Sequence, residues 1–262
     1  MHFMRTLLNF IRQIITITEY ETLKIIRTPT ELFSRSLQPV LWLLIFGQVF
    51  ARIHMEIIGQ QSYVLFIAPG IMAQSVLFVS IFYGLAIIWE RDLGIMHKIL
   101  VSPTSRNAII LGKGIAASIR SITQVIVVLL LVLLMQLTIN WSLFSILGII
   151  FFISLEAIIF STLSTIVACI VKTRERFMGI GQVITMPLFF ASNAIYPITI
   201  MPHWLQIIAT WNPLTYEVDA LRAFMLPNTI SAYGLMTDFF ILSGTMIALI
   251  IIGGWMYPKI IR

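Results

Sequence analysis

The 262-residue chain holds one cysteine, four histidines and few charged residues, and each scarcity excludes a class of protein. Cys169 alone cannot form an intrachain disulfide, and the scattered histidines offer no pair at the spacing of a metal site. Charged residues make up 11% of the chain and hydrophobic residues 59%, whereas soluble domains carry about 25% charged residues. The mean hydropathy is +0.97. We therefore predict an integral membrane protein.

Sequence motifs of enzyme chemistry are also missing. The phosphate-binding pattern G-x-x-x-x-G-K-S/T fails around Gly112-Lys113, because Asn107 occupies the upstream glycine position and Gly114 the Ser/Thr position. The sequence contains no nucleophile elbow and no supported Ser/His/Asp set. We expect no catalytic residue, no metal site and no cofactor bound by this chain. If the protein uses ATP, the ATPase is a different polypeptide.

Six apolar stretches are candidate transmembrane helices, which need about 20 largely apolar residues each. The first is the weakest, because only the part between Arg35 and Arg52 lacks charge. Pro69-Gly70 predicts a kink or an exterior start in the second, and Pro187 allows a kink in the fifth. The predicted spans, each boundary being good to several residues, are 33–52, 63–89, 118–139, 143–171, 177–195 and 237–257.

The basic residues predict the orientation of these spans in a cell (cytoplasmic) membrane. Fifteen of the 17 lysines and arginines fall on one predicted side, and only Arg52 and Arg222 fall on the other. Cytoplasmic loops carry this excess, so both termini are expected in the cytoplasm. The tryptophans agree, since five of the six lie near predicted boundaries: Trp89, Trp141, Trp204, Trp211 and Trp255. Because the net charge of +6 is spread over the ends of spans, it does not indicate a nucleic-acid partner.

The N-terminal residues 1–30 predict a cytoplasmic amphipathic helix. One face is apolar and the opposite face carries Arg5, Asn9, Arg12 and Gln13. This pattern is typical of a helix that lies along the membrane interface, although a helix packed on a partner protein gives the same pattern. The apolar side chains at helical spacing are Phe3, Met4, Leu7, Leu8, Ile11, Ile14 and Ile15.

A second amphipathic helix is predicted over residues 90–103, in the cytoplasmic connection between the second and third spans. Pro103 and the polar residues around it end the helix. Such a helix is either an anchor on the membrane surface or a docking element that inserts into a groove of a cytoplasmic partner. Its broad apolar face is formed by Leu93, Ile95, Met96, Ile99 and Leu100.

Residues 196–226 are too rich in tryptophan, leucine and isoleucine for a soluble loop and too interrupted by proline and charge for a span. Pro202 is expected to start a short helix that carries Trp204. Asn212 is expected to cap a second helix with Pro213 at its first position. Within the second helix, one face is apolar, with Leu214, Val218, Leu221 and Met225 on it and Glu217 at its edge.

These exterior amphipathic helices have two interpretations. They decorate the membrane interface, or they form a gate or lid over a pathway between subunits. Asp219 and Arg222 are three residues apart, a spacing that allows an ion pair. Glu156, in the middle of the fourth span, is a separate candidate, because a carboxylate there is costly and usually faces protein or water. It could touch a substrate or pair across helices, or play a purely structural role.

Several short stretches, in order along nearly the whole chain, carry a resemblance to one family. The chain resembles the membrane subunit of type-2 ABC transporters, an exporter group that includes drug, nodulation-factor and polysaccharide permeases. The most specific stretches are Glu90-Arg91-Asp92-Leu93-Gly94, Leu100-Val101-Ser102-Pro103, Ile110-Leu111-Gly112-Lys113, Pro202-His203-Trp204-Leu205-Gln206, Asn212-Pro213-Leu214-Thr215-Tyr216 and Asp219-Ala220-Leu221-Arg222. The departures from the pattern expected of relatives are Ile95 and His97-Lys98.

The resemblance implies a single transmembrane domain over residues 1–262, with six transmembrane helices, an N-terminal interface helix and short exterior helices between spans five and six. It implies a homodimer or a paired permease, and ABC ATP-binding subunits that hold ATP and Mg. The first cytoplasmic loop would be the coupling helix, with the ATPase-coupling residues Glu90, Arg91, Asp92, Leu93, Gly94, Met96, His97, Lys98 and Leu100. The exterior gate or lid would include Trp204, Asn212, Pro213, Tyr216, Asp219 and Arg222.

The leading hypothesis is therefore the permease subunit of an ATP-driven exporter of an amphipathic substrate, such as a drug, lipid or glycolipid. A polysaccharide exporter is the alternative within the same class, and its pathway would favour rings of aromatic side chains. An ion- or proton-coupled carrier that uses Glu156 is an alternative from another class, and a non-transporting scaffold is a third.

Overall fold

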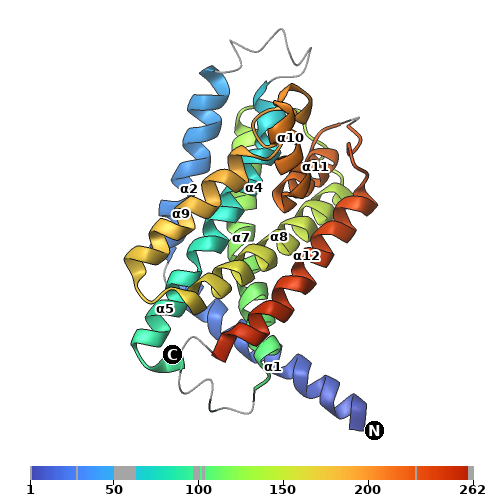
Figure 1. Ribbon diagram of the computed structural model, residues 1–262. Coiled ribbons are helices and arrows are strands. Elements are labelled where there is room, and N and C mark those ends of the chain that lie inside the picture. The colour runs from blue at the N-terminus through green and yellow to red at the C-terminus, as the bar shows by residue number, and fades with distance from the viewer. Residues whose placement is uncertain are drawn as a thin grey trace.

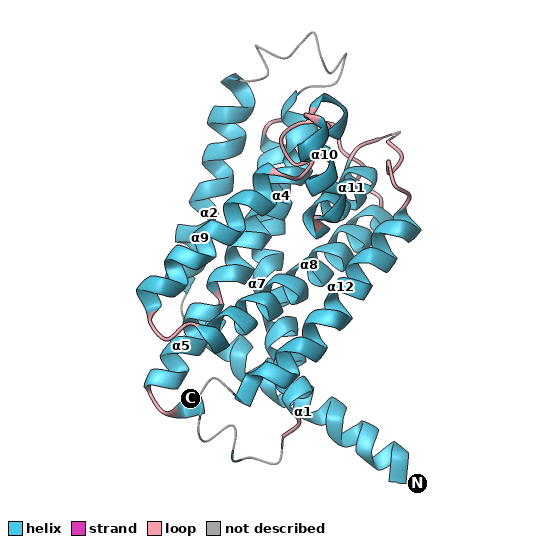
Figure 2. Ribbon diagram, in the orientation of Figure 1, coloured by secondary structure: helices cyan, strands magenta, loops and turns pink. Residues whose placement is uncertain are grey.

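In the described residues of the computed structural model, every regular element is a helix (Figures 1 and 2). The structure describes residues 2–27, 29–49, 63–96, 101, 104–227 and 229–258. The prediction of an all-α membrane protein is confirmed at this level. Four helices in these ranges are long and apolar enough to cross a membrane. They are the composite α4 (Tyr63–Phe82) with α5 (Gly84–Asp92), then α7 (Arg106–Leu134), α8 (Leu143–Ile170) and α12 (Leu235–Met256).

The other two predicted spans coincide with shorter helices. The first falls on α2 (Pro29–Leu41), which continues as the π-helical η1 (Trp42–Phe46). The end of that span lies outside the described residues. The fifth falls on α9 (Arg174–Phe190), which has Pro187 inside it. The prediction of six spans therefore stays a prediction, although each of the six stretches is helical over most of its described length. The third and fifth helices end earlier than predicted, at Leu134 and Phe190.

The two ends of the helix bundle carry different elements. The N-terminal end of α1 (His2–Arg27) and the C-terminal end of α12 lie at one end (Figure 1). The opposite end carries η2 (Ile198–Ile200), α10 (His203–Trp211) and α11 (Pro213–Met225). This arrangement is the one that the orientation prediction requires, with the termini on one side and the Trp-rich segment on the other.

The helix formed by α4 and α5 is interrupted at Tyr83, while α4 runs unbroken through Pro69. The hydroxyl of Ser164, on α8, accepts a hydrogen bond from Gly84 N at 2.9 Å and donates one to the carbonyl of Ile81. A side chain inserted into the helical hydrogen-bond ladder is a recognised cause of a break. A Cβ on Gly84 would lie 2.2 Å from Ser164 Oγ, so only glycine fits there.

The third predicted span begins too late. α7 starts at Arg106, capped by the Ser105 hydroxyl, which accepts from Ala108 N at 3.2 Å. Lys113 therefore lies inside the helix and not in a connection before it. Arg120, which the predicted span already contained, is buried against the Tyr83 ring, with 5.2 Å from its Cζ to the ring centroid. The sequence pattern misplaced the boundary because it treated the charge of Lys113 as solvated.

Candidate functional site

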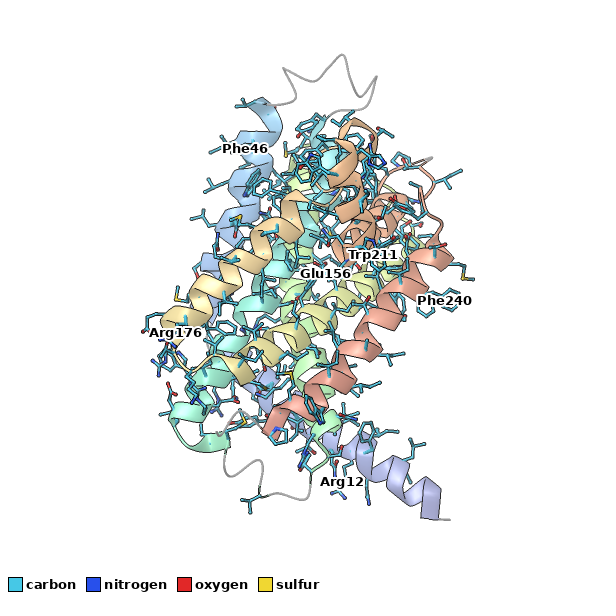
Figure 3. The ribbon with its side chains drawn as sticks, in the orientation of Figure 1. Arg12, Phe46, Glu156, Arg176, Trp211 and Phe240 are labelled. Atoms are coloured by element: carbon cyan, nitrogen blue, oxygen red, sulfur yellow. The ribbon has the colours of Figure 1, made fainter. Side chains whose placement is uncertain are left out.

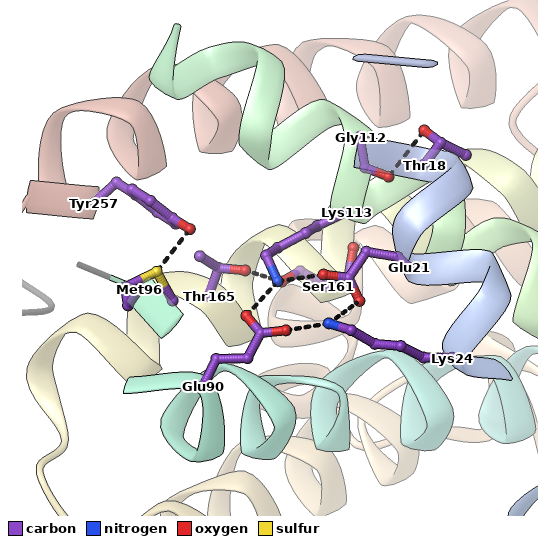
Figure 4. A network of polar contacts seen from close by, with 10 residues as sticks. All are labelled: Thr18, Glu21, Lys24, Glu90, Met96, Gly112, Lys113, Ser161, Thr165 and Tyr257. Carbon is purple, nitrogen blue, oxygen red and sulfur yellow. Dashed lines mark hydrogen bonds and ion pairs between the residues drawn. The ribbon is translucent and has the colours of Figure 1, made fainter. Parts of the chain in front are cut away.

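Four charged side chains form a closed ring where α1, α5 and α7 meet (Figure 4). Lys113 Nζ lies 2.6 Å from Glu21 Oε1 and 2.8 Å from Glu90 Oε2. Lys24 Nζ lies 3.2 Å from Glu21 Oε2 and 2.5 Å from Glu90 Oε1. The charges alternate around this ion-pair ring, so each cation has two anionic neighbours and each anion two cationic ones. The ring ties the N-terminal helix, the predicted coupling segment and a spanning helix together.

Three members of the ion-pair ring are almost wholly buried, with side-chain exposures of 2% for Lys113, 3% for Glu21 and 7% for Glu90. Burial alone raises the pKa of a carboxyl. In Glu21 the ammonium groups of Lys113 and Lys24 outweigh burial and lower the pKa from 4.5 to about 2. The ring is formally neutral, so none of its members is a buried charge without a partner, which is the arrangement that costs most in free energy.

Helix α1 reaches the ion-pair ring because α7 offers a glycine at the contact. A Cβ on Gly112 would lie 2.8 Å from Ile17 Cβ, so the two backbones approach closely only with glycine there. The hydroxyl of Thr18 donates to the carbonyl oxygen of Gly112 at 3.2 Å (Figure 4). The close backbone contact places Glu21, one turn further along α1, beside Lys113.

Arg91 and Asp92 link the end of α5 to the neighbouring helix ends. Arg91 donates to the carbonyl oxygens of Val171 at 3.2 Å and Lys172 at 2.5 Å, just beyond the C-terminus of α8. Unpaired carbonyls at a helix end attract cations. The Asp92 carboxylate accepts a hydrogen bond from Arg174, at the start of α9, at 2.9 Å. The adjacent residues Arg91 and Asp92 thus link α5 to two different helices, α8 and α9.

Beyond α5 the chain turns at Gly94, whose φ of +71° favours glycine. Leu93, at the turn, is 69% exposed. Met96 is fully buried, and its sulfur accepts a hydrogen bond from the Tyr257 hydroxyl at 3.1 Å (Figure 4). The segment 90–96 therefore contacts α1, α7, α8, α9 and the end of α12.

The predicted coupling residues divide into three groups. Glu90 and Met96 point into the protein, so they hold the segment and do not present themselves to a partner. Arg91 and Asp92 cross to neighbouring helices, and Leu93 and Gly94 form the turn. His97, Lys98 and Leu100 lie outside the described residues, as do Ile99, Ser102 and Pro103. In the described part of the segment predicted as a helix over 90–103, α5 ends at Asp92 and the chain turns at Gly94.

The predicted exterior helices begin where the sequence indicated. α10 starts at His203 directly after Pro202, and its Trp204 is 64% exposed. Asn212 caps α11: its Oδ1 accepts from Leu214 N at 3.0 Å, and Pro213 is the first helical residue. α11 itself is not a surface decoration. Eleven of its 13 residues are buried, among them Tyr216, whose hydroxyl donates to the carbonyl of Thr210 at 2.7 Å.

The ion pair between Asp219 and Arg222 does not form. Arg222 donates to the carbonyl oxygen of Asn193 at 2.9 Å and stands 4.1 Å above the Phe66 ring. Asp219 turns the other way and accepts from Ser231 at 2.8 Å. Burial of α11 gives each side chain a tertiary partner, and these partners displace the local pair that the spacing allowed.

Carboxyl groups of α11 and α12 share one hydroxyl. Ser231 Oγ lies 2.8 Å from Asp219 Oδ2 and 2.9 Å from Asp238 Oδ2, and it accepts from Gly234 N at 2.7 Å. A hydroxyl has one proton and two acceptor sites. It cannot donate to both carboxyl groups at once, so Ser231 is a shared partner that links α11 to the start of α12.

Glu156 lies halfway along the bundle, on α8, as predicted (Figure 3). It is fully buried, and so is Glu217 of α11, within electrostatic reach of it. Neither carboxyl has a hydrogen-bond partner among the described residues. Burial raises the pKa of the Glu217 carboxyl well above its usual range, and the charge of Asp238 adds to the effect. Within the described ranges, no group of acidic, histidine or cysteine side chains is arranged to hold a metal ion.

Comparison with known proteins decides the class. Residues 12–226 match the sequence profile of the family described as ABC-2 type transporter. The chain belongs to this family. It is 31% identical over 215 residues to the transport permease ycf38 of Cyanophora paradoxa, covering 81% of this chain and 74% of that protein. It is 22% identical over 197 residues to the daunorubicin resistance ABC transporter permease protein DrrB1 of Streptomyces coeruleorubidus, covering 75% of this chain and 69% of that one.

A shorter similarity, 26% over 167 residues and 63% of each chain, relates it to nodulation protein J of Bradyrhizobium diazoefficiens. The chain is thus a multi-pass membrane subunit of the ABC-2 type transporter family, and the resemblance inferred from its motifs is confirmed.

Sequence reasoning gave a site role to Glu90 alone and missed the other three members of the ion-pair ring, of which Lys24 was counted only among the basic residues. Lys113 stood in a stretch that carried the resemblance, but no role was given to it, and Glu21 was overlooked on the predicted interface helix. One signal was available: Glu21 precedes Lys24 by three residues on a helix whose other charges are mostly basic. Identifying its partner needed the true start of α7.

Proposed function

We propose that the chain is the permease subunit of an ATP-driven exporter, and that a separate ABC ATP-binding subunit carries ATP and Mg. The observation that supports this most strongly is the segment 90–96, which has an exposed turn at Leu93 and buried anchors on both sides of it. A partner that presses on this turn acts on a segment whose side chains hold five other helices. Force applied there is therefore distributed to the spans.

The proposed topology has six spans, with α2 and η1 as the first and α9 as the fifth. Both termini lie in the cytoplasm of a cell membrane, and α10 and α11 lie on the outer side. α1 rests along the inner interface, with Leu8 and Ile15 exposed by 61% and 59% and so available to lipid. The permease functions as a homodimer or with a second, related permease.

The proposed substrate is amphipathic: a drug-like molecule, a lipid or a glycolipid. The name of one relative, a daunorubicin resistance permease, supports an organic substrate rather than an inorganic ion. A polysaccharide is the alternative within the class.

The test is reconstitution with the cognate ATP-binding subunit, followed by copurification and substrate-stimulated ATP hydrolysis. Arg91→Ala removes both hydrogen bonds to the end of α8 and should lower the stimulated rate at least tenfold, because hydrogen bonds from charged groups contribute about 1.5–3 kcal/mol each and about 1.4 kcal/mol corresponds to tenfold in rate. Arg176→Ala, at an exposed arginine near the start of α9, is the matched control and should retain the rate. Failure to bind any ATP-binding subunit, together with normal transport by Arg91→Ala, would refute the proposal, and binding without substrate stimulation would indicate a scaffold.

One observation favours a proton-coupled carrier as the second candidate: Glu156 is a buried carboxyl without a partner in the described part of the chain. That carrier would transport in a pH gradient without ATP and lose transport in Glu156→Gln. The proposed exporter, by contrast, requires ATP both in the wild type and in Glu156→Gln.

A further inference from the structure

A pocket of about 260 Å³ lies between η1, α4 and the end of α9, towards the end of the bundle that carries α10. Five of its eight lining residues are aromatic: Trp42, Phe46, Tyr63, Phe190 and Tyr196. All come from one copy of the chain, so the pocket exists without a paired permease. Ligand sites in proteins are concave and mostly apolar in this way. Their volumes begin at about 300 Å³, so this pocket is suited to one part of a larger compound.

The tyrosines of the pocket offer ring faces more than polar groups. The Tyr63 hydroxyl donates to the carbonyl oxygen of Ile195 at 3.2 Å, and the Tyr196 hydroxyl donates to the carbonyl oxygen of Phe190. Both hydroxyl protons are thereby taken up by the backbone, and the remaining lining is almost wholly apolar. A sugar needs many hydrogen bonds to replace those it makes with water, and these side chains do not supply them.

The wall of the pocket formed by residues 191–196 is held in place from behind. A Cβ on Gly70 would lie 2.2 Å from the carbonyl oxygen of Ala194, so this wall packs directly on the α4 backbone. Arg222 donates to the carbonyl oxygen of Asn193 at 2.9 Å. Asn212 Nδ2 donates to the carbonyl of Ala191 at 3.2 Å. Two residues predicted to gate a pathway thus fix the wall, and the pocket is preformed.

We propose that this pocket binds the fused aromatic part of an amphipathic exported compound. That the bound compound is exported rests on the proposed function, whereas binding in the pocket does not depend on it. Aromatic faces favour planar rings, which stack offset or edge to face at centroid distances of about 4.5–7 Å. The volume is suited to one fused ring system, and the polar remainder of the compound would lie outside.

The test is equilibrium binding of daunorubicin, a fluorescent compound with fused rings, to the purified full chain in phospholipid nanodiscs. Phe190 is 45% exposed and Phe240, on α12, is 68% exposed, so neither truncation should unfold the protein. Phe190→Ala should raise the Kd about tenfold, the effect of losing one aromatic face. Phe240→Ala is the matched control away from the pocket (Figure 3) and should keep the wild-type Kd.

A second variant approaches the pocket from its buried side. Ile67→Trp fills the cavity and should weaken binding at least as much as Phe190→Ala, provided that size-exclusion chromatography shows a monodisperse protein. Wild-type Kd values in both variants would overturn the proposal, and so would displacement of daunorubicin by an alkyl chain alone, which would make the pocket a lipid site. Normal export by the complex together with unchanged binding in both variants would refute the pocket and leave the proposed function intact. Weaker binding in both variants, but no ATP-stimulated export by the complex, would support the pocket and refute the proposed function.

Discussion

Lys113 on α7 and Glu21 on α1 lie 2.6 Å apart with side-chain exposures of 2% and 3%, which makes this the most deeply buried ion pair in the described residues. A pair at such depth is not primarily a source of stability, because desolvation offsets most of the attraction. Its consequence is that each charge depends on the other, because removing one group leaves a buried, uncompensated charge that destabilises the folded state. The N-terminal helix is therefore part of the folded bundle.

Replacing Lys113 with methionine should destabilise the protein strongly, since it leaves two buried carboxylates with Lys24 as their shared cation. Breaking a buried pair typically costs about 3–5 kcal/mol. Thermal unfolding followed by tryptophan fluorescence in detergent would measure the loss. Lys172→Met, at an exposed lysine, is the control and should unfold near the wild-type temperature. Equal stability of the two variants would contradict the ring's structural role.

Stability should fall at acid pH in a way that depends on Glu21. Its pKa is about 2 in the folded protein and 4.5 by ordinary value, so the unfolded state binds more protons between these values. The contribution of Glu21 is complete above pH 4.5, decreases as the pH falls below it, and is lost near pH 2. Melting temperatures between pH 6 and pH 3 should therefore fall less steeply in Glu21→Gln than in the wild type. Glu19→Gln, at an exposed position of the same helix, should keep the wild-type slope.

Gly84→Ala, at the break between α4 and α5, should lower the free energy of unfolding of the protein by about 1–3 kcal/mol through overpacking. The new Cβ would lie 2.2 Å from Ser164 Oγ and 2.5 Å from the Phe177 ring. Gly244→Ala is the matched control, because a Cβ there has nothing within 4 Å. Denaturant or thermal unfolding of both variants compares them directly. A larger effect at Gly244 than at Gly84 would be inconsistent with the packing described.

Asp92→Asn should change stability by less than about 1 kcal/mol, because the pair with Arg174 is exposed and such pairs contribute little. The side chains are 39% and 40% exposed. Because the pair links α5 to α9, the variant should lower substrate-stimulated ATP hydrolysis by the reconstituted complex more than it lowers stability. A double-mutant cycle with Arg174→Gln would measure the coupling. A melting shift as large as that of Lys113→Met would show that the pair is structural.

The sequence predicted those features that depend on local chemistry. The start of α11 followed from Asn212 and Pro213, and the membrane class followed from composition. What it could not predict depended on tertiary partners. The start of α7 was misplaced because Lys113 is neutralised by residues far along the chain, and the Asp219–Arg222 pair was displaced by Ser231 and Asn193. Similarly, the break at Tyr83 comes from Ser164, 81 residues later in the chain, and not from the nearby Pro69.

The burial of the ion-pair ring has a consequence for ionic strength. Salt weakens attractions between exposed charges, with a screening length of about 3 Å at 1 M, and so strips helices that adhere to a bilayer through surface lysines and arginines. Counterions cannot enter between Lys113 and Glu21, whose side chains are 2% and 3% exposed. Concentrated salt should therefore leave α1 seated on α7, and vesicles washed in it retain a permease with its N-terminal helix in place.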